Sequence, residues 1–286
     1  MSDTLRAPRE EDAREVALLT SEHWPEPVDE AVVLRHWTFP GVQVEHDARL
    51  DRDSYALVES FGDERVWIGL AGRPTAVLLD WAERRAREKG GPRLISGGWT
   101  TQAALLRELE RREFRLVRNS HRMAIDLGER TGYPVWPAGV EVRTFEAGDE
   151  RVFYELHQET FEDSWEPLEE TYEEWAHDLL VPSALAPDLW VLATAEGDPA
   201  GFAICHPHPV DAELGWVRIL GVRRSWRGRG LGRALLLNAF SGFRRHGMKR
   251  AGLGVDAQSP TGANRLYESA GMHVSARFEI YEKVIA

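Results

Sequence analysis

Cysteine is almost absent from this chain, since Cys205 is the single one in 286 residues. A lone cysteine cannot close an intramolecular disulfide, and it excludes a metal site built from four cysteines. Long apolar runs are also missing, because no stretch approaches the roughly 20 residues that a membrane-spanning helix needs. The first twelve residues are charged and do not resemble a signal peptide. These features predict a cytoplasmic protein that does not act at a membrane.

Motifs of several common enzyme classes are missing as well. No Gly-Lys-Ser/Thr of a P-loop and no Gly-x-Ser-x-Gly of an α/β-hydrolase occurs. Cys205, His206 and His208 form a short group of potential metal ligands, but no second group accompanies them elsewhere in the sequence. We therefore expect no metal.

Positive charge is scarce overall, with 35 Lys and Arg against 47 Asp and Glu, a formal charge of −12. A chain this acidic repels nucleic acid and anionic lipid, so neither is an expected partner. The charge is local, however: residues 141–178 hold fourteen acids and two bases, whereas residues 218–250 hold ten bases and no acid. The basic stretch predicts an anionic ligand. The acidic stretch indicates either a cationic ligand or simply a solvated pair of helices.

The chain repeats itself on either side of a Pro- and Gly-rich segment at 130–139. Residues 5–12 and 142–149 each predict a short strand that runs into an acidic helix start, with the same Arg-to-Asp spacing. Apolar spacing predicts helices at 75–87 and 231–245, each followed by a short strand. Two copies of one α/β module, each a mixed sheet with helices on both faces, explain this pattern. The predicted parts are a first module at 1–129, a linker at 130–139 and a second module at 140–286.

The most informative segment lies where a predicted strand ends, a glycine-rich turn follows and an apolar-periodic helix begins. Glycine permits positive φ and close backbone approach, and the free N–H groups at a helix start attract anions. Arginine adds donor forks that match phosphate. The spacing Gly-x-Gly-x-Gly fits neither a P-loop nor a dinucleotide fold, yet it predicts a pyrophosphate site. The residues of this turn are Arg227, Gly228, Arg229, Gly230, Leu231, Gly232 and Arg233.

The pattern Arg227-Gly-Arg-Gly-Leu-Gly232 after Leu-Gly-Val resembles the acyl-CoA loop of GNAT superfamily N-acetyltransferases, which reads Arg/Gln-x-x-Gly-x-Gly/Ala. The later segments Gly254-Val-Asp-Ala257 and Leu266-Tyr267-Glu268 resemble the strand and helix that follow this loop in the family. The resemblance covers residues from about 140 to the C-terminus, and the first half only through the internal repeat. Tandem GNAT proteins of the mycothiol synthase-like type share the two-module layout.

The resemblance implies that acetyl-CoA is the co-substrate and that an amine attacks its thioester directly. The backbone of Leu220, Gly221 and Val222 would pair with the pantetheine arm, and the arginine-glycine loop would hold the pyrophosphate. Tyr267 would be the general acid that protonates the CoA thiolate; the alternative is an aromatic side chain that only packs. Ser259 and the proline after it replace an asparagine common in the family, so we expect any side-chain contact to CoA here from Ser259.

The general base is not identified by the resemblance, because Trp216 stands where relatives carry a carboxylate. An alkyl amine with a pKa near 10.4 loses its proton at pH 7 in about one molecule in 2,500, which costs roughly 4–5 kcal/mol. Glu213 is the first candidate to accept this proton, followed by Glu162 and Asp163. The alternative for each of the three is an ordinary surface carboxylate in contact with solvent.

The first module lacks the features that the second one carries. Its counterpart of the loop, residues 69–75, is shorter and contains Pro74, and Leu109 stands where the second module has Tyr267. We therefore expect one acetyl-CoA per chain and a single active site in the second module. The expected acceptor is the primary amine of a cationic small molecule. Alternatives are a non-catalytic acyl-CoA sensor or scaffold, transfer of another acyl group, and acylation of a protein amine.

Overall fold

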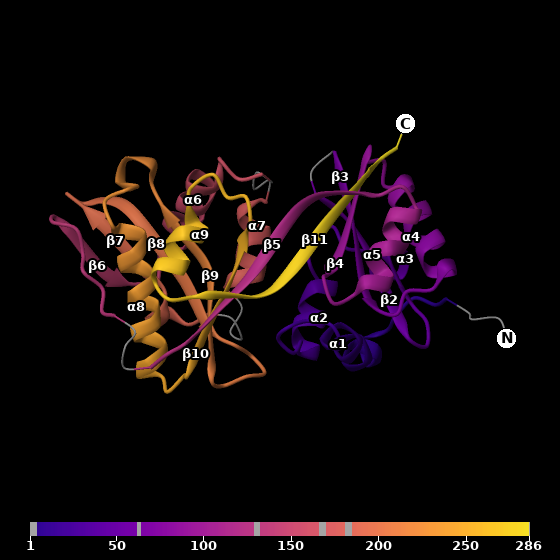
Figure 1. Ribbon diagram of the computed structural model, residues 1–286, viewed down its shortest axis with the longest axis horizontal. Helices are drawn as coiled ribbons and strands as arrows, with labels where there is room; N and C mark the ends of the chain where they lie inside the picture. Colours follow the sequence, from indigo (N-terminus) through magenta and orange to yellow (C-terminus); the bar gives the residue numbers. More distant parts are fainter. Residues whose placement is uncertain (1–4, 62–63, 129–131, 166–169, 181–184, 286) are drawn as a thin grey trace. The chain divides into compact units, whose positions relative to one another are not determined.

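The computed structural model describes residues 5–61, 64–128, 132–165, 170–180 and 185–285 (Figure 1). The contacts divide the chain into two compact units: unit 1 is Met1–Ser120 with Ala276–Ala286, and unit 2 is His121–Ser275. Strand β5 (Arg115–Asp126) leads from unit 1 into unit 2, and β11 (His273–Val284) leads back. The two boundaries between the compact units therefore fall within strands β5 and β11. The boundaries 1–129, 130–139 and 140–286 remain a prediction about modules.

Unit 1 is a mixed sheet with the strand order β1-β2-β3-β4-β11. Strands β3 and β4 are parallel, and β11 is antiparallel to β4 from Phe278 opposite Trp99 to Val284 opposite Arg93. One buried cluster joins α1 and α2 to the sheet, and another joins α4 and α5 to it. The elements are the 3-10 helix η1 (Glu10–Asp12), α1 (Ala13–Ser21), α2 (Glu30–Trp37), α3 (Val44–Asp47), β1 (Ala48–Leu50), β2 (Ser54–Phe61), β3 (Arg65–Gly72), α4 (Ala76–Glu88), β4 (Arg93–Trp99) and α5 (Ala103–Arg111).

Unit 2 follows the same plan with the strand order β5-β10-β9-β8-β7-β6. Its core has two clusters, one that includes α8 and α9 residues and one that includes α6 and α7 residues, so helices cover both faces of the sheet. This confirms the predicted mixed sheet. The elements are β6 (Val140–Thr144), α6 (Glu150–Phe161), α7 (Tyr172–Leu179), η2 (Pro187–Leu189), β7 (Val191–Ala195), β8 (Asp198–Pro207), β9 (Leu214–Val222), η3 (Arg224–Trp226), α8 (Leu231–Arg245), β10 (Arg250–Asp256) and α9 (Ala263–Ser269).

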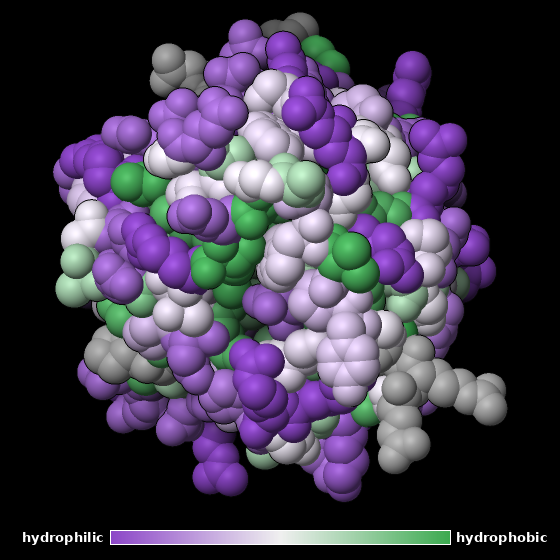
Figure 2. All heavy atoms as spheres, turned by 90° about the vertical axis from the view of Figure 1, so that its left-hand side faces the viewer, coloured by the Kyte–Doolittle hydropathy of each residue, from purple (hydrophilic) through white to green (hydrophobic). Residues whose placement is uncertain are grey.

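Strand β6 ends this order, and its side chains Glu141 and Arg143 are charged. Charged residues on a free strand edge disfavour pairing with another chain. Figure 2 shows the side of unit 2 where β6 and β7 lie: hydrophilic side chains cover most of this face, and hydrophobic atoms form a strip near its middle and smaller separate patches. This face is therefore not a large apolar surface.

The feature of unit 2 that positions a site is an irregularity in β9. Ile204 pairs with Ile219 but Cys205 pairs with Val217, so Arg218 is an extra residue that bulges from the β8–β9 ladder. A bulge bends its strand and increases the local twist. The parallel register with β10 ends at the same place, at Val217 opposite Leu253. The last part of β9 therefore presents an edge that β10 does not cover.

Candidate active site

The glycine-rich turn connects this open end of β9 to helix α8. Gly228 and Gly230 have φ values of 75° and 86°, and Gly230 is the residue that caps the amino end of α8. Nothing lies within 4 Å of where a Cβ would stand at either glycine, so their positive φ, and not crowding, explains the residue type. The first-turn N–H groups of this 15-residue helix consequently follow a turn that has open space at the two glycine positions. This arrangement suits a phosphate group.

Arg227 is the arginine of this turn that the protein itself binds most completely. Its Nε donates to the carbonyl of Val222 at 3.1 Å, one terminal nitrogen donates to Asp163 at 3.0 Å, and the other donates to the carbonyl of Thr160 at 3.1 Å. The guanidinium group thus joins the end of β9 to the end of α6. Its side chain bonds protein groups with all three nitrogens.

Arg229 and Arg233 differ from Arg227, because both are exposed on the turn side of α8. Arg229 stacks its guanidinium on the ring of Trp226, 4.8 Å from the centroid. Arg233 makes no ion pair or side-chain hydrogen bond with any residue that the structure describes. These two arginines are the cations that a bound anion could reach without breaking a salt bridge.

Three carboxylates of the acidic stretch form ion pairs with four arginines of the basic stretch. Asp163 forms ion pairs with both Arg224 and Arg227, and these arginines lower the pKa of its carboxyl group. Glu159 pairs with Arg223 at 2.8 Å, and Asp178 pairs with Arg218 at 2.5 Å. These carboxylates on and beside α6 and α7 therefore have internal partners. The expectation that the acidic stretch faces a cationic ligand gains no support from them.

The three β9 residues predicted to meet the pantetheine arm lie beyond the last residue paired with β10. Leu220 is half-buried and packs against the core on the α8 side of the sheet. Gly221 faces the other side, where a Cβ would overlap Thr160 Oγ1 and the ring of Phe202. Val222 is half-buried and gives its carbonyl to Arg227. The side chains thus anchor the strand in the core, and the strand's edge remains available for an extended ligand.

Tyr267 lies on α9, after β10, and its side chain is only 8% exposed. It belongs to the buried cluster that includes Leu231, the first residue of α8. Burial raises the pKa of its phenol to about 12, so the group stays protonated at neutral pH. Among the residues that the structure describes, none forms a hydrogen bond with this hydroxyl. A buried tyrosine normally bonds a partner, so this hydroxyl has unused capacity to bond a ligand.

The segment between β10 and α9 is held by a residue that the sequence patterns did not single out. Asn264 donates from Nδ2 to the carbonyls of Asp256 at 2.8 Å and Ala257 at 3.3 Å, while its Oδ1 is buried without a partner. Ser259, the predicted CoA contact, bonds Thr261 at 2.9 Å. A polar residue two positions before the Leu266-Tyr267 pair was the available signal, but no spacing rule linked it to those carbonyls.

The three candidate bases lie in different surroundings. Glu213 is exposed and forms an ion pair with Lys249, at the amino ends of β9 and β10. Tyr267 follows the carboxyl end of β10, and a strand of seven residues spans about 23 Å, so the structure does not bring these two together. Glu162 is exposed at the end of α6. Asp163 is held ionised by two arginines, which makes it a poor proton acceptor.

Trp216 packs against residues from the neighbouring strands. It lies opposite His206 in the β8–β9 register, and the guanidinium of Arg122 from β5 stacks on its ring at 4.7 Å. Gly252 on β10 has no side chain, and a Cβ there would meet the Trp216 ring. Where relatives are expected to carry a carboxylate, this chain therefore has the Trp216 ring, covered by the guanidinium of Arg122. The sequence could not predict the pair, since no spacing connects β5 to β9.

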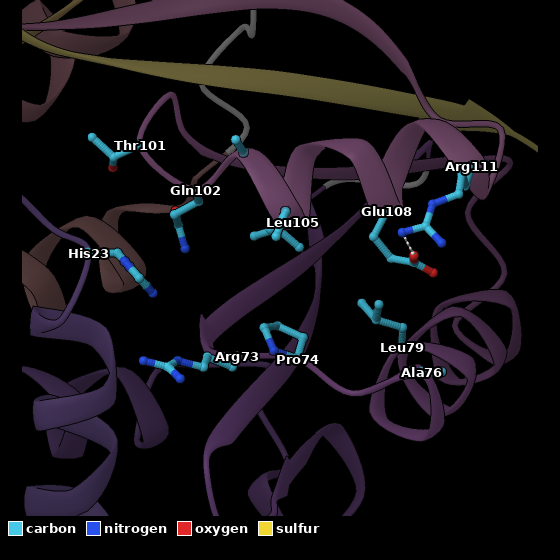
Figure 3. Close-up of a pocket in the computed structure, with 13 residues that line it drawn as sticks. His23, Arg73, Pro74, Ala76, Leu79, Thr101, Gln102, Leu105, Glu108 and Arg111 are labelled. Carbon is cyan, nitrogen blue, oxygen red and sulfur yellow. Dashed lines mark ion pairs between the residues drawn. The ribbon is translucent and has the colours of Figure 1, made fainter.

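In unit 1 the counterpart of the glycine-rich turn lies beside a cavity of about 500 Å³ (Figure 3). Pro74 and Leu105 line it, and the side chains of His23 and Arg73 lie at the end away from Glu108 and Arg111. The start of α4 is capped by its own Thr75 hydroxyl, which accepts from the N–H of Leu78 at 3.2 Å. Leu109 is buried in the core of this unit. The glycine turn and the tyrosine of unit 2 therefore have no counterpart at these positions.

Two further searches concern only the part of the chain that the structure describes. No helix there is both long and apolar enough to cross a membrane. No group of three or more His, Cys, Asp or Glu side chains there is arranged to hold a metal ion.

Comparisons with known proteins concern the family and the fold of the chain. Residues 151–272 match the model of the acetyltransferase (GNAT) family. A solved GCN5-related N-acetyltransferase from Sphaerobacter thermophilus is 31% identical, with a TM-score of 0.79, and the alignment covers 98% of this chain and 95% of that one. A tandem GNAT protein from the clavulanic acid biosynthesis pathway, 14% identical, shares the fold with a TM-score of 0.75 over 98% of both chains.

A curated relative, the mycothiol acetyltransferase of Thermobispora bispora, is 32% identical over 214 residues, which are 71% of this chain and 67% of the relative. The corresponding protein of Thermomonospora curvata is 36% identical over 140 residues, and the match spans less than half of either chain. The chain belongs to the GCN5-related N-acetyltransferase (GNAT) family. It is an N-acetyltransferase with the tandem GNAT fold, as the sequence motifs predicted.

Proposed function

We propose that the chain transfers an acetyl group from acetyl-CoA to the primary amine of a small molecule, with one active site in the C-terminal module. The observation that supports this most directly is the open end of β9, which leads into the positive-φ glycine turn at the start of α8. One edge thereby offers backbone groups to pantetheine and free N–H groups to a pyrophosphate. GNAT acetyltransferases use acetyl-CoA in general, and the turn fits it.

The proposed chemistry uses Tyr267, which lies on α9 in the buried cluster that includes Leu231 at the start of α8. The amine nitrogen attacks the thioester carbonyl, forms the C–N bond and expels the CoA sulfur as a thiolate. As charge builds on the sulfur, the phenol donates its proton, and the amine gives up its own proton to a base or to water. The phenol enters the reaction protonated, as it would at its ordinary pKa, and its raised pKa makes it a weaker acid, so the support for this role is its place in the fold. Glu213 remains only the sequence-based candidate for the base.

The acceptor is proposed at the level of a small-molecule amine. The curated relatives are named mycothiol acetyltransferases, and this name describes those proteins. In this chain the stacked pair of Trp216 and Arg122 lies before the bulge, and the nearby acids are paired with arginines. Trp216 is itself buried beneath this guanidinium, and the paired acids give no support to an acceptor selected for its positive charge.

Substitution of Tyr267 by Phe tests the proposal. We expect turnover to fall about 10²-fold or more, because the proton donor is lost, while the affinity for acetyl-CoA stays the same. Turnover is measured by mass spectrometry of acetylated products from a panel of amines, and affinity by calorimetry. Tyr133→Phe is the matched control, because Tyr133 is exposed. Unchanged turnover would remove Tyr267 as the acid. Tight acetyl-CoA binding without acetylation of any amine would favour a binding module.

The number of bound acetyl-CoA molecules tests the assignment to one module. The start of α4 is capped by Thr75 and follows a proline, so this position of unit 1 differs from the glycine turn that is proposed to hold the pyrophosphate. We expect calorimetry to give one acetyl-CoA per chain. Substitution of Gly230 by Val, which is strained at a φ of 86°, should abolish this binding. A measured ratio of two would contradict the assignment.

A further inference from the structure

Arg227 matches the first position of the family's loop motif, yet its surroundings differ from those of a phosphate ligand. Two of its three bonded partners are backbone carbonyls, those of Val222 and Thr160, and the third is Asp163. To reach a phosphate, the guanidinium would have to leave all three. Both carbonyls would then lose a charge-assisted hydrogen bond. Arg227 is therefore placed to hold two elements together.

Asp163 makes the second half of this connection. It follows the last turn of α6 and accepts hydrogen bonds from Arg227 and, with both carboxylate oxygens, from Arg224. Next to it, Glu159 of α6 bonds Arg223 at 2.8 Å, and Arg223 also bonds the carbonyl of Pro199 at 2.9 Å. Side chains from the last turn of α6 and just beyond it are thus tied to the segment that runs from β9 into the glycine turn.

The consequence lies in the strand itself. Beyond Val217 no described residue of β10 is in register with β9, so this end of β9 lacks the support of one neighbouring strand. Residues 220–222 are the ones proposed to pair with pantetheine. Helix α6 packs on this part of the sheet, since Thr160 lies against Gly221. An anchor between α6 and Val222 replaces the missing strand as a support.

We propose that Arg227 and Asp163 are positioning residues that fix the open end of β9 against α6, and that Arg229, Arg233 and the backbone N–H groups of the turn contact the pyrophosphate. This inference rests on the proposed acetyl-CoA site. It divides the arginines by role: those bonded to α6 shape the edge that binds pantetheine, and the exposed ones bind charge.

Hydrogen exchange in the ligand-free protein tests the positioning role without any CoA. We expect Arg227→Gln to speed amide exchange about tenfold or more at residues 219–222 and in the last turn of α6. Arg233→Gln, the matched control, should leave these amides unchanged. Asp163→Asn keeps the size of the side chain and should give a smaller effect at the same amides. Unchanged exchange in Arg227→Gln would overturn the proposal, whether or not the protein binds CoA.

Binding of CoA and of pantetheine, which has no phosphate, separates the two roles. Arg227→Gln should weaken both ligands by a similar factor, about ten- to hundredfold, because it disturbs the strand edge that both would use. Arg233→Gln should weaken CoA alone. Loss of CoA affinity in Arg227→Gln with full pantetheine affinity would make Arg227 a phosphate ligand and overturn the inference. If the unaltered protein binds neither ligand, the proposed function fails, while the exchange result still decides the anchor.

Discussion

At the scale of single residues, the internal repeat includes an arginine–aspartate ion pair that has the same geometry in both units. Arg6 and Asp12 form two parallel bonds of 2.6 Å, and Arg143 and Asp149 form two of 2.5 and 2.7 Å. In each copy the same aspartate oxygen also accepts a backbone N–H three residues upstream. The six-residue spacing thus encodes a carboxylate that ties the start of the first helix to β6 in unit 2 and, in unit 1, to Arg6, which forms only an isolated bridge with Leu50 where the sequence predicted a short strand.

This arginine–aspartate ion pair should stabilise both units in a pH-dependent way. Arg6 lowers the pKa of Asp12 to about 2, and Arg143 lowers the pKa of Asp149. A carboxyl group whose pKa is lower in the folded state adds stability above its unfolded pKa near 3.9 and loses it as the pH falls toward the folded pKa. We expect Asp149→Asn to lower the free energy of unfolding by roughly 1.5–3 kcal/mol at pH 7 and much less near pH 2.5.

Urea unfolding at several pH values measures this effect. Asp198→Asn, at the exposed first residue of β8, is the control and should change the free energy by less than about 0.5 kcal/mol. An equal loss at pH 7 and pH 2.5 would show that the pair acts through packing and not through charge.

The sequence could indicate candidate site residues only where a local pattern marks them. The glycine turn, Tyr267 and the Arg-to-Asp spacing are all features of neighbouring residues. The bonds of Arg227 to Asp163 and Thr160 connect positions more than sixty residues apart. Only the fold brings these positions together. From the sequence, the acidic and basic stretches indicated two different ligands, whereas in the structure several of their side chains pair with each other.

At the scale of elements, the site depends on how closely α6 packs on β9. Gly221 permits this contact, because a Cβ would overlap both Thr160 and Phe202. Alternation of apolar residues could predict the strand. It could not predict the bulge at Arg218, which depends on the pairing of β8 with β9. The open edge is therefore a property of three strands and one helix together.

Substitution of Gly221 by Ala should push α6 away from β9. We expect the free energy of unfolding to fall by about 1–3 kcal/mol through overpacking, with weaker CoA binding as well. Gly132→Ala is the control, since the nearest atom to its Cβ would be Leu237 Cδ1 at 3.8 Å. Denaturant unfolding and calorimetry measure the two effects. Stability equal to that of the control would show that the sheet accommodates the methyl group by shifting.

At the scale of the whole molecule, the chain returns to its first unit at its end. Residues of β11 from Phe278 to Val284 pair with β4, and Tyr281 is buried in the core of unit 1. The composition of the Pro- and Gly-rich segment at 130–139 indicates a linker between two modules. Composition is local, however, and gives no sign that a strand far along the chain completes a sheet begun before residue 100. This is why the module pattern could be predicted and the division into compact units could not.

The last prediction follows from this return of the chain. Residues 1–129 expressed alone lack β11, so one edge of β4 is unpaired and the core loses the Tyr281 ring. An exposed strand edge promotes aggregation, and loss of a large buried aromatic side chain costs about 3–5 kcal/mol. We therefore expect the fragment to be poorly soluble and to unfold without a cooperative transition. The control is co-expression with residues 140–286, which supply β11 on a separate chain and should restore a soluble pair. If residues 1–129 alone unfold cooperatively at the temperature of the intact protein, β11 is dispensable for unit 1, and the linker at 130–139 is also the structural boundary.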